Sequence, residues 1–508
     1  MKLKSRSGKA LVSTISELLF ELVAVICGFI LPRLILSHFG STYNGITLSI
    51  SQFIGTIALL KAGIGSVTRA ALYKPLARNN PEEISEVVNA TKKFMRKVAM
   101  IFTVAVMIFA AVYPLFVSND FDWFFAFTLF IILSVDTFAQ YFFGLPYQMV
   151  LQADQRAYVI SIVSIISVIA NTIVASALII AGFGIHVVKL GSAIVFLFPP
   201  IFYMLWVKKQ YHIDDTIAPN DKLIAQRWDA FAHQLANFIN TNTDIIIVTI
   251  ILNLKEVSVY SVYYLVGNAI KKVVNAVGTG TMAAFGNMLA KGEDQLLKKR
   301  FSEFECLFFY VSTILLTITA ILLTSFVSVY TKGINDVNYI RESFAILVSL
   351  SILLMCIKVP YEQLVFAAGH FKQTRNAAFV EAGIHIVLSI GLTFFLGLNG
   401  IVLGVIIATV YRLIVYSSYV YSNLIKLSRI VLLLRFIYTI TVFVGGLVLY
   451  EIFGTKLATT YLEWAIHAVV VCISVFIPST VLAYLMFKNE MKSILEVLLI
   501  KLGVRIHH

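Results

Sequence analysis

Ionisable side chains occur in the middle of long apolar stretches of this 508-residue sequence. At mid-depth in a bilayer such a group costs roughly 2.5–3.5 kcal/mol, so it normally faces a water-filled cavity or an opposite charge. The sequence therefore marks a set of candidate functional residues, four basic and three acidic: Lys61, Lys271, Lys272, Arg412, Asp136, Asp244 and Glu362.

The four basic residues suit a cationic cavity that binds an anionic substrate. Lys61 and the adjacent pair Lys271 and Lys272 fall in stretches that take equivalent places in the two halves of the chain, which favours one shared cavity. Neighbouring residues of a helix point about 100° apart, so we expect only one of the pair to face it. The alternative is internal pairing that locks helices together, and Lys358 and Glu362 have the one-turn spacing of a helical ion pair.

The three acidic residues are candidates for carrying a coupling proton or a sodium ion. Asp136 and Asp244 each lie in the middle of an apolar stretch. The alternative is a structural role, in which hydrogen bonds from neighbouring side chains satisfy each carboxylate. An alternating run of Asn and Thr at 240–243 offers such hydrogen bonds to Asp244.

The elements that position these residues are predicted to be transmembrane helices. The sequence is 59% hydrophobic and 13% charged, with a mean hydropathy of +0.88, which is too few charges for a soluble surface. The apolar stretches exceed both the roughly 20 residues of a spanning helix and the roughly 10 alternating residues of a barrel strand. We predict an all-α polytopic membrane protein with about 14 transmembrane helices, at 11–36, 44–70, 95–118, 122–150, 157–182, 186–207, 229–253, 257–286, 302–330, 341–367, 376–396, 400–424, 430–453 and 462–487.

The sequence predicts no enzyme, cofactor or metal site. The four cysteines all fall in apolar stretches without CxxC spacing, and the nine histidines form no HExxH motif. No nucleotide-binding glycine loop or nucleophile elbow is present in the sequence. The longest predicted loops, near 71–94, 208–228 and 287–301, leave no room for a soluble catalytic domain.

The basic residues behind the net charge of +13 lie mostly on one side of the predicted membrane, which argues against a nucleic-acid partner. In the fourteen-helix arrangement, 29 of the 40 Lys and Arg residues fall on one side, 6 on the other and 5 inside helices. Cytoplasmic loops carry the excess of basic residues, so both termini are predicted to be cytoplasmic. We expect the basic side chains there to contact lipid head groups.

Short features recur at a nearly constant spacing, which indicates a duplicated plan. The pairs, each separated by almost the same length of chain, are Tyr43 with Tyr260, Gly63 with Gly278, Pro146 with Pro360 and Gly184 with Gly400. Transporters commonly move two such repeats against each other around a central site. We predict two six-helix lobes related by pseudo-two-fold symmetry, at 1–207 and 229–425, joined by a cytoplasmic loop at 208–228. Two additional helices and a cytoplasmic tail follow at 426–508, and either pad the bundle or extend the binding surface.

Several motifs resemble bacterial oligosaccharide-lipid flippases of the polysaccharide transporter family, within the multidrug/oligosaccharidyl-lipid/polysaccharide exporter superfamily. In the first half they are Tyr43-Asn44-Gly45, Ala62-Gly63-Ile64-Gly65-Ser66 and Leu72-Tyr73-Lys74-Pro75-Leu76-Ala77. In the second half they are Asp244, Phe371-Lys372, Glu381, Ser389 and the glycines Gly397, Gly400 and Gly404. The resemblance covers most of residues 1–425, and the Leu-Tyr-Lys-Pro-Leu run is its most specific part.

The resemblance implies two six-helix lobes that work by alternating access in a bacterial cytoplasmic (inner) membrane. It also implies movement of undecaprenyl-diphosphate-linked oligosaccharide repeat units to the outer leaflet for surface polysaccharide synthesis. The expected partners are this lipid-linked glycan, membrane lipids, a glycan polymerase and other polysaccharide-assembly proteins, with possible proton or sodium coupling by antiport. The sequence departs from the family at Lys61, where many relatives are expected to have an acidic residue.

Two other classes of function stay open. A cation-coupled multidrug or metabolite exporter of the same superfamily would usually have twelve helices and an acidic cavity, whereas this sequence predicts fourteen helices and buried lysines. A membrane enzyme such as a glycan polymerase or glycosyltransferase would need a catalytic loop or an acidic metal site. The short outer loops supply neither.

Overall fold

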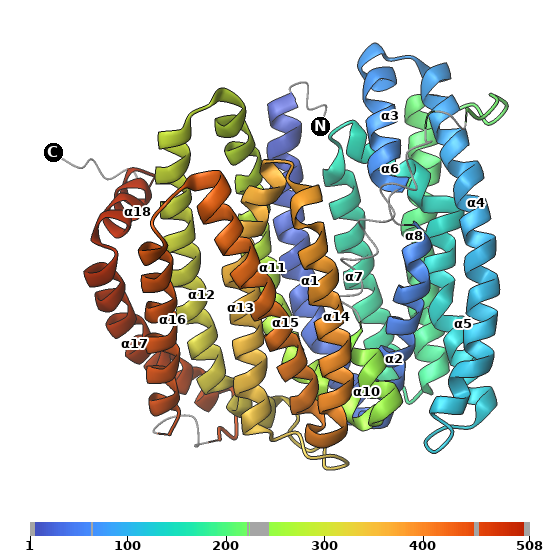
Figure 1. The fold of residues 1–508 in the computed structure, drawn as a ribbon. Helices are drawn as coiled ribbons and strands as arrows, with labels where there is room; N and C mark the ends of the chain where they lie inside the picture. The colour runs from blue at the N-terminus through green and yellow to red at the C-terminus, as the bar shows by residue number, and fades with distance from the viewer. Residues whose placement is uncertain (1–5, 62–63, 221–222, 224–242, 452–456, 502–508) are drawn as a thin grey trace. The chain divides into compact units, whose positions relative to one another are not determined.

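The chain is an all-helical, multi-pass membrane protein in its computed structural model (Figure 1). The structure describes residues 6–61, 64–220, 223, 243–451 and 457–501, and all its regular elements are helices within those ranges. Eleven of the helices there are long and apolar enough to cross a membrane. By its internal contacts the chain divides into two compact units, Met1–Ser258 and Val259–His508, called unit 1 and unit 2 below.

Eleven of the predicted spans coincide with these eleven helices, and three do not. The stretch 44–70 is interrupted by a 3-10 turn at Lys61, and most of 229–253 lies outside the described residues. The stretch 257–286 falls within one long helix, Leu254–Lys291, which does not count among the apolar spans. Its charged pair, Lys271 and Lys272, lowers the hydropathy there.

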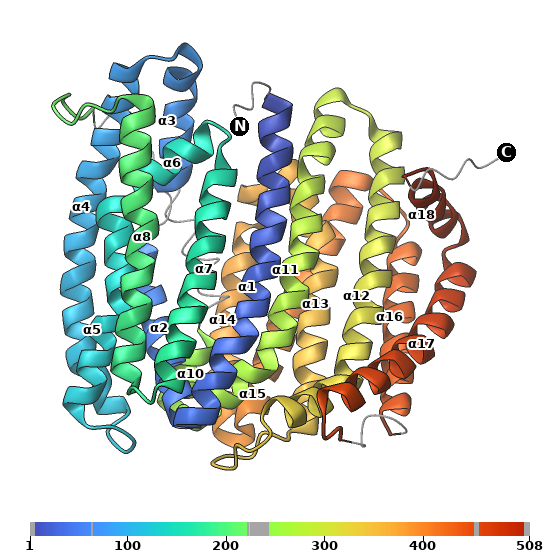
Figure 2. The ribbon, with the colours of Figure 1, turned by 180° about the vertical axis from the view of Figure 1, so that it is seen from behind.

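Unit 1 is built from helices that pack both on chain neighbours and on helices distant in the sequence (Figures 1 and 2). The helices are α1 (Arg6–Phe39), α2 (Ser41–Ile57), α3 (Ile64–Arg78), α4 (Pro81–Val112), α5 (Trp123–Ala139), α6 (Leu145–Ala153), α7 (Ala157–Ile180), α8 (Ile185–Tyr211) and α10 (Asp244–Ile251). Helix α1 lies along α7, and α7 and α5 both pack on α8. A buried apolar core joins α2, α4, α5 and α6.

A proline explains the break between α5 and α6. A short π-helical segment, η3 (Gln140–Gly144), separates the two helices. Pro146 follows directly, in the first turn of α6. Proline has no backbone N–H and its ring collides with the carbonyl four residues earlier, which disfavours regular α-helical geometry at that point. The wider π-turn takes up the strain and lets one long span continue to Ala153.

Unit 2 is also built of helices within the described residues. Helix α11 (Leu254–Lys291) crosses the unit boundary, and the other helices are α12 (Asp294–Tyr330), α13 (Glu342–Ala367), α14 (Phe371–Leu396), α15 (Leu398–Tyr419), α16 (Arg429–Leu449), α17 (Tyr461–Met486) and α18 (Lys488–Lys501). The starts of α4, α7 and α8 precede those of α12, α14 and α15 by almost the same length of chain. This spacing agrees with the duplicated plan. The lobe boundaries at 207, 208–228 and 425 stay predictions.

A buried ion pair attaches the added helices to the rest of unit 2. Arg435 of α16 lies 3.0 Å from Glu305 of α12, and both side chains are 0% exposed. Tyr361 of α13 and Tyr421 of the π-turn η5 (Val420–Ile425) donate hydrogen bonds of 2.5 and 2.8 Å to the same carboxylate. Glu490 of α18 lies 3.7 Å from Arg435. Five elements therefore meet at one pair of opposite charges.

Removing only the positive member of this pair should destabilise unit 2 strongly. Arg435→Met leaves the Glu305 carboxylate buried without a cation, and breaking a buried pair in this way costs about 3–5 kcal/mol. We expect a lower melting temperature for the purified protein in detergent, largely restored in the double variant Glu305→Gln/Arg435→Met. Arg429→Met, at an exposed position of the same helix, is the matched control. A normal melting temperature for Arg435→Met would contradict this role.

A polar clasp holds the chain that follows α8 against α4. Asp215 lies 2.9 Å from Lys92 of α4 and 2.5 Å from Lys208 of α8. The Asn89 amide of α4 donates to the carbonyl oxygens of Asp214 and Ile217, both at 2.9 Å. Although partial burial alone would raise the pKa of Asp215, hydrogen bonds from the two lysines lower it below its usual value.

The clasp should be sensitive to acid. A carboxyl group whose pKa is lowered by folding contributes stability above its unfolded pKa of about 3.9, and this is lost as the pH falls through the folded pKa. At pH 7 we expect Asp215→Asn to speed proteolysis of this segment, with an effect of about 0.2–1 kcal/mol because the site is partly exposed. The difference from wild type should shrink and then vanish as the pH falls below the unfolded pKa and through the lowered folded pKa of Asp215. Asp120→Asn serves as the control, and a difference that grew with acidity would contradict this sign.

Candidate functional site

A chain of alternating charges runs through the centre of unit 2. Glu362 and Lys358 of α13 are 3.2 Å apart, Lys358 lies 3.1 Å from Glu381 of α14, and Glu381 lies 3.1 Å from Arg412 of α15. Arg412 also donates a hydrogen bond to Tyr416, one turn later. The two positive charges of the network equal its two negative charges, and buried charges need such pairing in an apolar medium.

The network shows where two predicted site residues lie. The Lys358–Glu362 pair expected from the one-turn spacing is present. Arg412 is 7% exposed and its charge is matched inside unit 2 by Glu381, which is 8% exposed. Substrate binding by Arg412 and ion coupling by Glu362 stay predictions. In either role these side chains would act from within an ion-paired cluster.

In unit 1, the predicted residues Lys61 and Asp136 lie close enough to attract each other electrostatically. Lys61 ends the 3-10 turn η1 (Ala58–Lys61), with its ammonium 5.6 Å from the centre of the Tyr141 ring. The Tyr141 hydroxyl donates a 2.6 Å hydrogen bond to the carbonyl of Ala58, which fixes the ring under the turn. Asp136 of α5 accepts a 2.6 Å hydrogen bond from the backbone N–H of Thr137.

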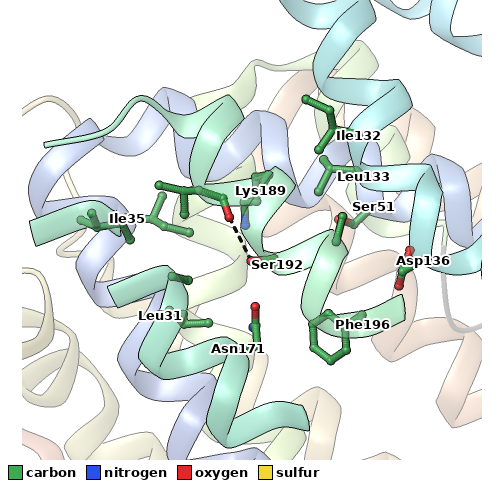
Figure 3. A pocket seen from close by; sticks show the side chains of 14 residues that line it. Leu31, Ile35, Ser51, Ile132, Leu133, Asp136, Asn171, Lys189, Ser192 and Phe196 are labelled. Carbon is green, nitrogen blue, oxygen red and sulfur yellow. Dashed lines mark hydrogen bonds between the residues drawn. The ribbon is translucent and has the colours of Figure 1, made fainter. Parts of the chain in front are cut away.

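Asp136 also lines a pocket of about 190 Å³ in unit 1 (Figure 3). Five helices contribute to its wall, namely α1, α2, α5, α7 and α8. Most lining side chains are apolar, including Leu31, Ile132 and Phe196. The polar lining residues are Ser51, Asp136, Asn171, Lys189 and Ser192. A cation and an anion thus face one small, mostly apolar space.

The remaining predicted residues lie on α10 and α11. Asp244 is the first residue of α10 and is half-buried. Its neighbours 240–242 lie outside the described residues. Lys271 is half-buried and lies near enough to Cys356 of α13 to influence it electrostatically, whereas Lys272 is exposed. The two lysines therefore differ in environment, as expected for adjacent residues of a helix. The shared cationic cavity stays a prediction.

Three residues that matter in the structure were not among the sequence candidates. Glu381 entered only through a family resemblance, yet it bridges Lys358 and Arg412. Lys189 lies near the start of α8. In the sequence it is close to one end of a predicted span, where a lysine at the membrane interface is ordinary. Asn171 lies in the middle of the apolar helix α7 and was not among the predicted residues. A polar amide at such a position itself indicates a nearby polar group. No trio of potential metal ligands occurs within the described ranges.

Comparison with solved structures identifies the fold. The inward closed conformation of the lipid II flippase MurJ matches with a TM-score of 0.71 and 14% identity, over 92% of this chain and 99% of that one. An inward-facing multidrug resistance MATE transporter of the MOP superfamily matches with a TM-score of 0.58 and 12% identity, over 80% and 98%. The chain has the fold of these membrane transporters.

A further structural match is a MOP superfamily transporter from Pyrococcus furiosus whose binding pocket is described as having reversed polarity. Its TM-score is 0.54 at 13% identity, over 83% of this chain and 97% of that one. No protein-family model and no curated protein sequence matches the chain.

The two glutamates of the unit 2 network should differ in their effect on stability. Glu381→Gln leaves Arg412 without a carboxylate and Lys358 with Glu362 alone, so we expect a loss of about 3–5 kcal/mol. Glu362→Gln leaves Lys358 paired with Glu381, so we expect a loss of about 1 kcal/mol or less. Thermal unfolding of the purified variants measures the difference, and each serves as the other's control. Equal losses would show that Glu381 does not bridge the cluster.

Proposed function

We propose that this protein is a flippase that moves undecaprenyl-diphosphate-linked oligosaccharide repeat units from the inner to the outer leaflet of a bacterial cytoplasmic membrane. Both termini are cytoplasmic in this proposal, and the two halves alternate between inward-open and outward-open states. The translocated glycan then enters surface polysaccharide synthesis, together with a glycan polymerase and other assembly proteins. No covalent step is required of the chain.

The extent of the fold match carries the proposal. The match to the MurJ flippase covers 92% of this chain. The uncovered part is shorter than the segment 426–508, which contains α16–α18. The match therefore includes part of that segment. The MATE match covers 80% of the chain, and the part that it leaves out is long enough to contain the whole segment. Because α16 is attached through the buried Glu305–Arg435 pair, the added helices are integral to unit 2.

The charges inside the membrane suit an anionic, lipid-linked substrate. A diphosphate-linked glycan cannot cross hydrocarbon unaided, because its polar groups would lose their hydration. In the proposal Lys61, Lys271 or Lys272, and Arg412 supply compensating positive charge, while the prenyl tail stays in lipid. Asp136, Asp244 and Glu362 are the candidates for coupling transport to a proton or sodium gradient.

The alternative is a cation-coupled multidrug or metabolite exporter. The observation that favours it is Asp136, an acidic group on the wall of a mostly apolar pocket, which suits a cationic drug. Lys189 on the same wall weighs against a purely cationic ligand. The two functions predict different consequences of losing the gene.

Deletion of the gene in its host, followed by complementation, separates them. We expect loss of surface polysaccharide, with intact lipid-linked repeat units stranded on the cytoplasmic face of the membrane. Wild type should restore export, whereas Lys61→Ala and the double variant Lys271→Ala/Lys272→Ala should restore it at least about tenfold less well, since charge-assisted contacts to phosphate would be lost. Lys97→Ala, on the exposed face of α4, is the control.

Other outcomes contradict the account. Unchanged polysaccharide and lipid-linked pools combined with raised drug sensitivity would favour the exporter. Full export by both lysine variants, at wild-type protein levels, would exclude the cationic cavity while leaving the flippase itself in place.

A further inference from the structure

The unit 1 pocket contains a buried acceptor with no donor. Asn171 of α7 is 8% exposed, and its carboxamide oxygen has no hydrogen-bond partner. Leaving such a group unpaired costs about 1–3 kcal/mol. The residue lines the pocket, so an N–H or O–H group placed there would satisfy it (Figure 3).

The same pocket contains an ammonium group with no acceptor. Lys189 of α8 lines it, and within the described part of the chain this lysine has neither a hydrogen bond nor an ion pair. Asp136 is on the same wall, but the electrostatic partner of Asp136 is Lys61 rather than Lys189. An anionic group in the pocket would therefore give Lys189 the partner that it lacks.

The two serines of the pocket are available only as acceptors. Ser51 donates its hydroxyl hydrogen to the carbonyl of Thr47 at 2.7 Å, and Ser192 donates to Val188 at 3.2 Å. The two serine oxygens, the Asn171 oxygen and the Asp136 carboxylate thus give four groups that can accept, against one strong donor, Lys189. This set matches a ligand that carries both an anion and an N–H-rich cation.

We propose that this pocket binds a phosphoethanolamine-type zwitterion. The phosphate pairs with Lys189, and the primary ammonium donates to the Asn171 oxygen and to Asp136. A quaternary ammonium has no N–H to donate, so a phosphocholine group would leave Asn171 unsatisfied. A volume of about 190 Å³ admits such a head group and excludes an oligosaccharide. This site is therefore separate from any glycan-binding cavity.

Two sources of this chemistry are possible, a lipid head group and a free solute. The surfaces of α7 and α8 favour the lipid, because Ile173, Ile180, Leu190 and Ile194 are exposed there and would contact acyl chains. The proposal is independent of the flippase function, since it concerns a ligand of unit 1 alone.

Lipid retention by the purified full-length protein tests the proposal. The protein is incubated with equal amounts of phosphatidylethanolamine, phosphatidylcholine and phosphatidylglycerol, and the lipids retained are counted by native mass spectrometry. We expect phosphatidylethanolamine to be retained about tenfold more than either of the others, equivalent to about 1.4 kcal/mol. Free phosphoethanolamine is added in a second arm as a competitor.

The variants separate the two contacts. Lys189→Met should lower the retention of all three lipids, because each carries the phosphate that pairs with Lys189. Asn171→Leu should make phosphatidylethanolamine and phosphatidylcholine equivalent. Each replaces a polar group by an apolar one of similar size, so loss of folding is not expected. Lys97→Met is the matched control on an exposed face of unit 1. The melting temperature of each variant confirms that the protein is folded.

Each result supports or overturns the proposal. Selective retention that depends on Lys189 and Asn171 supports a lipid ligand, and binding of free phosphoethanolamine without lipid selectivity supports the same chemistry from a solute. Equal retention of all three lipids without competition by the free compound overturns it. So does retention of phosphatidylethanolamine that is unchanged in Lys189→Met, or retention of phosphatidylglycerol as strong as that of phosphatidylethanolamine.

Discussion

The cost of placing a charge in hydrocarbon governs this structure. Isolated charges at mid-membrane are expensive, so each one needs an opposite charge, several hydrogen bonds or access to water. Glu305 and Arg435 meet this requirement at 0% exposure with help from two tyrosines, and Glu381 meets it by bridging Lys358 and Arg412. These clusters fix how the helices of unit 2 pack. They also distinguish charges that hold the fold together from charges that can act on a ligand.

Unit 1 follows the same rule with a different result. Its core is apolar and aromatic. Lys61, at the break between α2 and α3, and Asp136 of α5 attract each other, while Lys189 and Asn171 face a small pocket with their polar groups unmatched. Unmatched polar groups in a pocket are sites for a ligand. In unit 2, by contrast, the buried charges pair with one another across helices. Such pairing within one unit suits a mechanism in which the unit moves as a rigid body.

Sequence reasoning reached the fold class because hydropathy and helix length are local properties. Eleven predicted spans coincide with observed helices, although the helices from Pro81 and Asp294 begin well before the predicted starts at 95 and 302. The Lys358–Glu362 pair followed from helical spacing alone. Neither the break at Lys61 nor the π-turn before Pro146 was predicted, although Pro146 marks the position of the second in the sequence. The Glu305–Arg435 pair joins residues that are far apart in the sequence, and each lies near the start of a predicted span, 302–330 or 430–453. Pairing over such a separation is set by the tertiary fold.

The flippase proposal is tested most directly by transport in a purified system. The protein is reconstituted into vesicles that contain a lipid-linked oligosaccharide, and the fraction reachable by an impermeant glycan-modifying enzyme is followed with time. The account predicts that lipid confined to the inner leaflet becomes accessible only in vesicles with protein, and more slowly with the Lys61→Ala variant. Unchanged accessibility in those vesicles, alongside uptake of a cationic drug, would contradict it.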